Sequence, residues 1–254
     1  MKRKILCSTL LATVAFSGTA VSVGAASGDP MKTNGKVEVT DGVIDPGDGV
    51  TDPEKPEDKL PNLPEIKPNP NPDMGPLEIS HAPELDFGKV KTATKDVRAY
   101  AKANTFTDST GAEQTRGPIL QFGDLRTAQD GYEVSAKMTK QFTQTTGTGE
   151  LTGSTITLTN PYADTAANST GTKPTFESTV TLEYNQSVKL ASADKTKAKE
   201  GKGMWAVEYG SSKNVATDDT TANSVELLIP ANTASSMAGG NYLADIEWSI
   251  KAAP

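Results

Sequence analysis

Short runs of alternating apolar and polar residues, separated by clusters of Gly, Asn, Asp, Ser and Thr, follow one another from residue 77 onward. Successive side chains of a strand point to opposite faces, so a period of two is typical of half-buried strands. Threonine favours strands and occurs 27 times between Thr92 and Thr233. The pattern predicts an all-β domain, either a β-sandwich or a barrel-like fold. The expected strands are 85–90, 97–103, 119–122, 132–138, 155–159, 179–184, 188–190, 204–209, 225–229 and 242–250, and residues 191–199 fit either a short helix or a charged loop.

The region before this domain has a different composition. Eleven of the 16 prolines lie between Pro30 and Pro83, in a stretch with few aromatic residues and an excess of acidic ones. Such a composition buries too little apolar surface to offset the entropy of ordering, and its prolines favour an extended chain. We therefore predict a disordered, acidic, Pro-rich linker over residues 27–76, followed by the all-β domain over residues 77–254.

The N-terminus has the features of a secretory signal peptide. Lys2, Arg3 and Lys4 precede an apolar run that is short for a membrane span, and small residues follow it up to Ala26. We expect residues 1–26 to be removed on secretion, which leaves no transmembrane segment in the mature chain. Removal also takes away Cys7, the only cysteine, so no disulfide can stabilise the mature protein.

Charge and composition exclude several classes of function. Without residues 1–26 the chain has 22 basic and 32 acidic residues, and such a balance does not favour binding to nucleic acid. One histidine and no mature cysteine exclude Cys/His zinc sites, and a Ser-His-Asp triad would have to use His81, which we expect on the surface at the start of a strand. Asp124 and Arg126 are best explained as a local ion pair or a turn hydrogen bond. We predict a protein that is not an enzyme and has no cofactor and no metal.

Two tryptophan motifs are the most distinctive feature of the domain. Trp205 and Val207 form one apolar row of a strand, and a second row of alternate apolar residues includes Trp248 and Ile250. Each row fits either a core or a binding face, since large aromatic side chains dominate both. One confident strand, 225–229, lies between the two motifs. We expect it to return antiparallel, so that the two rows lie close together as neighbours or on facing sheets.

The order of these motifs resembles the WxL domain, a family of exported surface proteins of low-GC Gram-positive bacteria. The resemblance covers roughly residues 75–254. The triplet Trp-x-Leu occurs here as Trp205-Ala206-Val207 and Trp248-Ser249-Ile250, and both replacements of Leu are β-branched apolar residues. The matching pieces, in order, are LDFGKV, GDLRTAQDGYEVSAKM, ELTGSTITLTNPY, GKGMWAVEYG, SVELLIPANT and GGNYLADIEWSIKAAP.

The resemblance implies noncovalent attachment to the Gram-positive cell wall, through peptidoglycan or another cell-wall polymer, and assembly with other exported surface proteins. It implies wall-binding motifs at Trp205, Val207, Trp248 and Ile250. The lack of an LPxTG-type sorting motif near Pro254 also favours a noncovalent attachment. The alternative is an adhesin or carbohydrate-binding β-sandwich for host or plant polymers, with aromatic side chains as sugar platforms.

Overall fold

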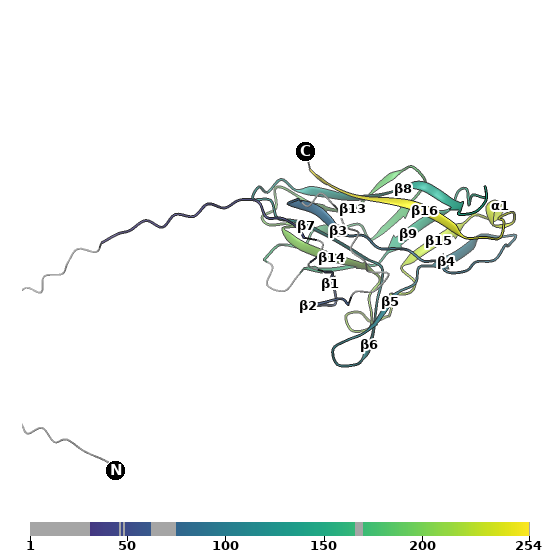
Figure 1. Cartoon of the computed structure of the whole chain (residues 1–254), viewed down its shortest axis with the longest axis horizontal. Helices are drawn as coiled ribbons and strands as arrows, with labels where there is room; N and C mark the ends of the chain where they lie inside the picture. Colours follow the sequence, from purple (N-terminus) through teal and green to yellow (C-terminus); the bar gives the residue numbers. More distant parts are fainter. Residues whose placement is uncertain (1–30, 46, 48, 62–74, 166–169, 254) are drawn as a thin grey trace, which may run out of the picture. The chain divides into compact units, whose positions relative to one another are not determined.

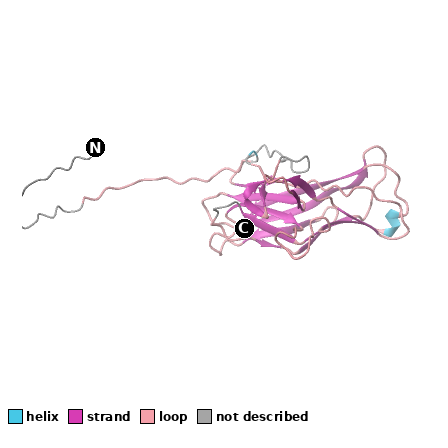
Figure 2. Cartoon of the chain, turned by 90° about the horizontal axis from the view of Figure 1, so that it is seen from below, coloured by secondary structure: helices cyan, strands magenta, loops and turns pink. Residues whose placement is uncertain are grey.

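The fold is known from a computed structural model, which describes residues 31–45, 47, 49–61, 75–165 and 170–253. The signal peptide predicted over residues 1–26 therefore lies outside the described residues. The chain divides into two units, 1–38 and 39–254, and residues 31–38 of the first contain no strand or helix. The described part of the second unit consists almost entirely of strands (Figure 2).

Twelve strands form three four-stranded sheets in which every strand pairing is antiparallel. The β14 sheet has the order β10 (Pro161–Thr165), β14 (Gly203–Tyr209), β7 (Ile119–Asp124), β3 (Leu77–His81). The β8 sheet has the order β11 (Thr175–Phe176), β13 (Ser187–Ala193), β8 (Tyr132–Gln144), β16 (Tyr242–Ala252). The β9 sheet has the order β12 (Thr179–Leu182), β9 (Thr155–Thr159), β15 (Val225–Ile229), β4 (Val97–Tyr100). Two hairpins, β1 (Thr51–Asp52) with β2 (Lys55–Lys59) and β5 (Asn104–Thr107) with β6 (Glu113–Arg116), and the helix α1 (Ala231–Ala234) complete the described elements.

The longest strands, β8 and β16, pair with each other and extend over the other sheets (Figure 1). Alternate residues of β8 point inward, and Tyr132, Val134, Ala136 and Met138 are buried in one continuous core that all three sheets share. Burying one such apolar side chain stabilises a fold by about 1.5–3 kcal/mol. The edge strand β3 lies beside β16, and β12 lies beside β13. The all-β, sandwich-like class predicted from the sequence is confirmed.

Most of the predicted strands are present, and β9 and β15 have the predicted bounds. Residues 85–90 are different, since they form no strand. The Asp86 carboxylate accepts the backbone N–H of Gly88 at 2.7 Å, and Gly88 has a φ of 66°, which turns the chain out of the extended conformation. The helical alternative for residues 191–199 is wrong, because β13 continues to Ala193 and the chain then turns.

Residues 50–60, which we call the N-terminal strap, do not behave as the predicted linker. Val50 and Leu60 are buried against Ile119 and Ala206, and the backbone N–H of Leu60 donates to the carbonyl of Val50 at 2.8 Å. The strap therefore packs on the strands β7 and β14. The Pro-rich composition concealed this packing, because Val50 and Leu60 are the only apolar residues of the strap besides its two prolines. Residues 27–30 and 62–74 of the expected linker lie outside the described residues.

A buried ion pair joins the strap to the strands beneath it. The Arg116 side chain is fully buried and donates to both carboxylate oxygens of Asp52, at 2.7 and 2.8 Å. Its Nη1 lies 3.0 Å from Glu54, whose carboxylate also accepts the N–H and hydroxyl of Ser212 at 2.6 Å. Bidentate pairs of an arginine with a carboxylate are among the strongest hydrogen-bonded pairs in proteins. A buried charge that loses its partner destabilises the folded state.

We expect Asp52→Ala to lower the free energy of unfolding by about 3–5 kcal/mol, because it leaves the Arg116 guanidinium buried without its bidentate partner. Lys102→Ala is the matched control. Its ion pair with Asp86 is largely exposed, so its loss should cost less than about 1 kcal/mol. Urea unfolding of both variants measures the difference, and equal losses would contradict a structural role for the buried pair.

The carboxyl group of Glu208 is buried beside this ion pair. Its Oε2 accepts the N–H of Gly117 at 3.0 Å, and the side chain is fully buried in β14. Burial raises the pKa of Glu208 from the ordinary 4.5 to about 10, and the negative charge of Glu54 adds to the rise. Glu208 is therefore protonated in the folded protein at neutral pH.

This protonation predicts a pH-dependent stability. Between pH 4.5 and about 10 the folded protein holds a proton on Glu208 that the unfolded chain has lost. The contribution of Glu208 to the free energy of unfolding should therefore fall as the pH rises, by up to about 1.4 kcal/mol per pH unit. Glu208→Gln removes the titration, so its stability relative to the unmodified protein should increase from pH 5 to pH 9. A constant difference in urea unfolding across this range would refute the assignment.

Candidate functional site

Trp205 lies in the interior of the β14 sheet. β7 and β10 flank its strand, with Phe122 and Thr165 as the paired residues. Only 2% of Trp205 is exposed, Val207 is fully buried, and the indole N–H donates to the carbonyl of Lys202 at 3.2 Å. Neither side chain has enough accessible surface in this fold to bind a polymer. The first predicted motif is therefore part of the core.

Trp248 and Ile250 lie on β16 at the edge of the β8 sheet, where they are half-buried and pack against the shared core. They pair with Ala136 and Val134 of β8. Polar residues such as Glu247 alternate with them and are exposed, as the period of two predicted. Of the four predicted site residues, these two keep some accessible surface.

The strands of the two motifs are not neighbours. β14 and β16 belong to different sheets. β16 lies beside the edge strand β3, and β7 and β3 separate it from β14. The intervening strand β15 belongs to the third sheet, so it does not pair with either motif. Trp205 and Trp248 nevertheless contribute to the same continuous core. Both tryptophans thus contribute to packing between the sheets. Their spacing along the chain did not distinguish such packing from a shared binding face.

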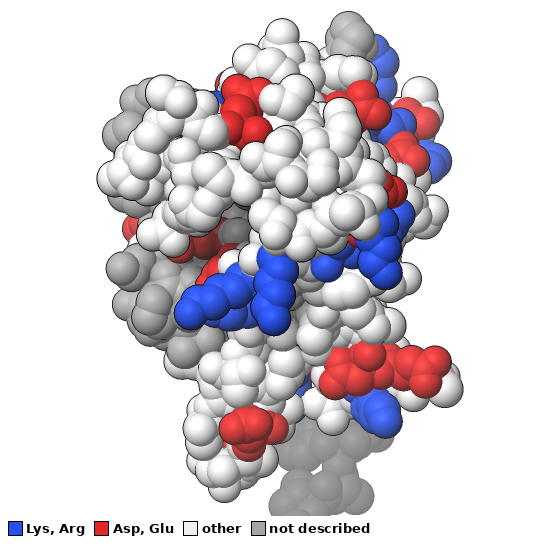
Figure 3. Space-filling model, turned by 90° about the vertical axis from the view of Figure 1, so that its right-hand side faces the viewer, with Lys and Arg blue, Asp and Glu red and all other residues white. Residues whose placement is uncertain are grey.

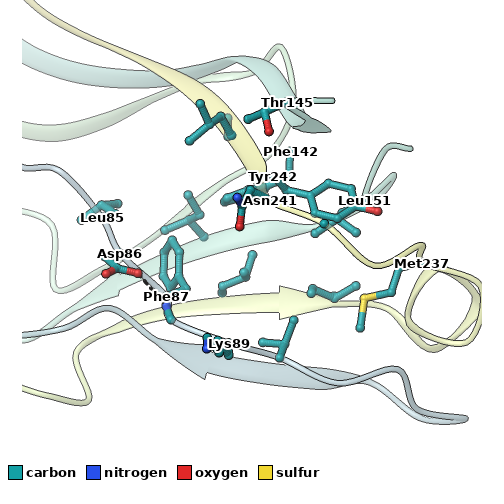
Figure 4. Close-up of a pocket in the computed structure, with 18 of the residues that line it drawn as sticks. Leu85, Asp86, Phe87, Lys89, Phe142, Thr145, Leu151, Met237, Asn241 and Tyr242 are labelled. Carbon is teal, nitrogen blue, oxygen red and sulfur yellow. Dashed lines mark hydrogen bonds between the residues drawn. The ribbon is translucent and has the colours of Figure 1, made fainter. Parts of the chain in front are cut away.

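An apolar groove, which we call the β16 groove, opens beside Trp248. Its volume is about 1220 Å3, and β16 forms one side while the segment 83–92 forms the other. Figure 4 shows Phe87 and Met237 projecting into this space from opposite ends. The apolar residues that line its floor are Phe142, Leu151, Ile156, Leu227 and Ile229.

The segment that borders the groove is held by polar contacts on its outer side. Lys102 pairs with the Asp86 carboxylate at 2.6 Å, and this hydrogen bond, with that from Gly88, lowers the pKa of Asp86. The Phe87 ring meets the Phe142 ring edge-on, with centroids 6.1 Å apart. The side chains of the groove floor are nevertheless buried, since Phe142 is 8% exposed and Ile156 and Ile229 are not exposed at all.

The surface offers little for binding a sugar or a metal. The exposed aromatic residues among those described include Tyr100, on the edge strand β4 of the β9 sheet, and Tyr184, which bridges to Met138 of the β8 sheet. On the face shown in Figure 3, uncharged residues dominate, and basic and acidic residues form small groups. No cluster of metal-ligating side chains occurs within the described residues. Among the same residues, no helix is long and apolar enough to cross a membrane.

Two polar residues singled out in the sequence have structural roles. Arg126 donates to both carboxylate oxygens of Asp124 at 2.9 Å, which confirms the predicted local ion pair. His81, expected on the surface at the start of a strand, is instead buried at the end of β3. The expectation was wrong, since His81 is 2% exposed and pairs with the buried Gln121 of β7.

The sequence model of the WxL domain, described as a surface cell wall-binding domain, matches residues 26–254. The chain belongs to the WxL domain family. It is a cell-wall-associated surface protein, and the family supports its location at the cell wall. The match begins well before the resemblance recognised at residue 75, and it includes the N-terminal strap. No curated protein and no solved structure matches the chain significantly.

The two WxL motifs should differ in their effect on stability. Trp205→Ala removes a fully enclosed ring and should lower the free energy of unfolding by about 3–5 kcal/mol. Trp248→Ala should cost only about 1–3 kcal/mol, because part of this ring is already in contact with solvent. Urea unfolding gives both values, with Tyr184→Ala at an exposed position as the control. A larger loss for Trp248 than for Trp205 would contradict this assignment of the core.

Proposed function

We propose that this WxL protein is a non-catalytic surface protein, secreted and held at the Gram-positive cell wall by noncovalent binding of its folded β-domain to peptidoglycan. The observation that carries the proposal is the family match, which covers the described sheets and the strap together. The proposal therefore assigns wall binding to the folded domain as a whole. The groove and the buried clusters contain no arrangement of residues that calls for a reaction.

The two tryptophan motifs serve wall binding by holding the sheets in place. Trp205 and Val207 are buried, so their contribution must pass through the packing of the β14 sheet. Trp248 and Ile250 fix β16 against β8 and leave part of their surface at the domain edge. β-branched replacements of the family leucine preserve this packing, because they keep each row apolar.

Peptidoglycan suits this chain better than an anionic wall polymer. The chain has an excess of acidic residues, so an anionic polymer would be repelled unless a basic patch compensated. The face in Figure 3 shows Lys and Arg in small groups only. Other exported surface proteins are the further partners that the family resemblance suggests.

Noncovalent attachment predicts how the protein leaves the cell. Guanidinium chloride should strip the full-length protein from intact cells at its mature mass, because unfolding destroys the binding surface. Muramidase treatment should not be needed. The measurement is an immunoblot of the released fraction, with a covalently sorted wall protein of the same cells as the control. Release that occurs only after wall digestion, with cell-wall fragments attached to the chain, would overturn the proposal.

A further inference from the structure

Asn34 is the only asparagine of the sequence that is followed by a glycine. Asn34 and Gly35 are exposed and belong to residues 31–38, which form no strand or helix. Within the described part of the chain, no residue forms a hydrogen bond with either of them. A Cβ atom added to Gly35 would meet no atom within 4 Å outside the neighbouring residues. The backbone nitrogen of Gly35 is therefore open to solvent and to the side chain before it.

The side-chain amide of Asn34 is next to this nitrogen along the chain. Attack of the Gly35 nitrogen on the side-chain carbonyl carbon Cγ of Asn34 closes a five-membered ring. Two groups of one molecule that reach each other in this way react much faster than the same groups on separate molecules. Glycine in the second position favours the attack, because it has no Cβ to hinder the approach and rotates freely into the conformation that the ring requires.

We propose that Asn34 is a site of spontaneous deamidation, which leaves a mixture of aspartate and isoaspartate at position 34. Each event replaces a neutral amide by a carboxylate. Lys32, Lys36 and Glu38 surround the site, so the added charge makes the acidic and basic groups there equal in number. The isoaspartate product also lengthens the backbone by one carbon atom. The inference concerns a covalent modification and does not depend on the proposed wall binding.

The reaction needs only water as a second reactant. In the first step a bond forms between the Gly35 nitrogen and Cγ of Asn34, and the bond between Cγ and the amide nitrogen breaks. The amide nitrogen leaves as ammonia, together with the proton of the Gly35 N–H. Water then opens the resulting succinimide at one of its two carbonyl carbons. Opening at one carbon restores the original backbone and gives aspartate, and opening at the other gives isoaspartate.

The pair Asp41–Gly42 shows how the folded unit protects a comparable sequence. The N–H of Gly42 donates to the carbonyl of Leu125 at 2.9 Å, which fixes the nitrogen that would attack. The Asp41 carboxylate accepts the N–H and the hydroxyl of Thr127 at 2.7 Å, and these hydrogen bonds lower the pKa of Asp41. An ionised carboxylate is a poor target for a nitrogen nucleophile. Among the described residues, none restrains the pair at positions 34 and 35 in either way.

Incubation of the freshly purified protein in neutral buffer, followed by peptide mass spectrometry, tests the proposal. Cleavage after Glu38 gives a peptide that contains position 34, and this peptide should become heavier by the difference between a hydroxyl and an amino group. Isoaspartyl methyltransferase should label the isoaspartate product. Gly35→Ala should slow the mass change several-fold, and Asn34→Gln should abolish it over the same period. Asn232→Gln changes an asparagine that no glycine follows, so it should behave like the unmodified protein.

The variant Asp41→Asn gives the sharpest comparison, because it places a second Asn–Gly pair on the folded unit. Position 41 should keep its amide while position 34 loses it, since the hydrogen bond from Gly42 to Leu125 remains. In urea both positions should deamidate at similar rates. Complete retention of the Asn34 amide in the unmodified protein would overturn the proposal, as would equal rates at the two positions in the folded variant. No wall material takes part in these measurements, so their failure is distinct from failure of the proposed wall binding.

Discussion

Burial of alternate side chains along β8 and β16 is the interaction on which the rest of this structure depends. The sequence contains a single cysteine, Cys7, so no disulfide within the chain can supplement its core. Tyr132, Val134, Ala136 and Met138 of β8 are all buried, and the half-buried row that includes Trp248 extends the same core along β16. Through this shared core, the two long strands hold the β14 and β9 sheets together in one fold.

The buried charged residues hold the N-terminal strap against the sheets. Arg116 joins β6 to the strap through Asp52 and Glu54, and the neutral Glu208 fills the adjoining space in β14. Replacement of such a cluster by apolar residues need not weaken a protein, so its value lies in fixing one position for the strap.

Alternation in the sequence predicted the fold class and most strands, because a period of two reports directly on half-burial. It predicted β9, β15 and the inward row of Trp248 well. The alternation wrongly predicted a strand at residues 85–90, where the hydrogen bond from Gly88 to Asp86 forms a turn. It also missed the strap, because only two apolar residues of this Pro-rich segment are buried. The buried state of Trp205 and the position of Arg116 depend on which strands flank them, and spacing along the chain does not contain that information. One signal could have revealed the strap: Val50 and Leu60 are apolar residues at the two ends of a short Pro-containing segment.

Binding of the folded chain to purified peptidoglycan tests the central claim most directly. The measurement is cosedimentation of the mature protein with peptidoglycan that has been freed of proteins and anionic polymers. We expect saturable binding that guanidinium chloride reverses, equal binding by Trp205→Phe if its melting curve is unchanged, and none by the unfolded chain. The account would be contradicted if the folded protein stayed in the supernatant at every peptidoglycan concentration, or if the unfolded chain bound equally well.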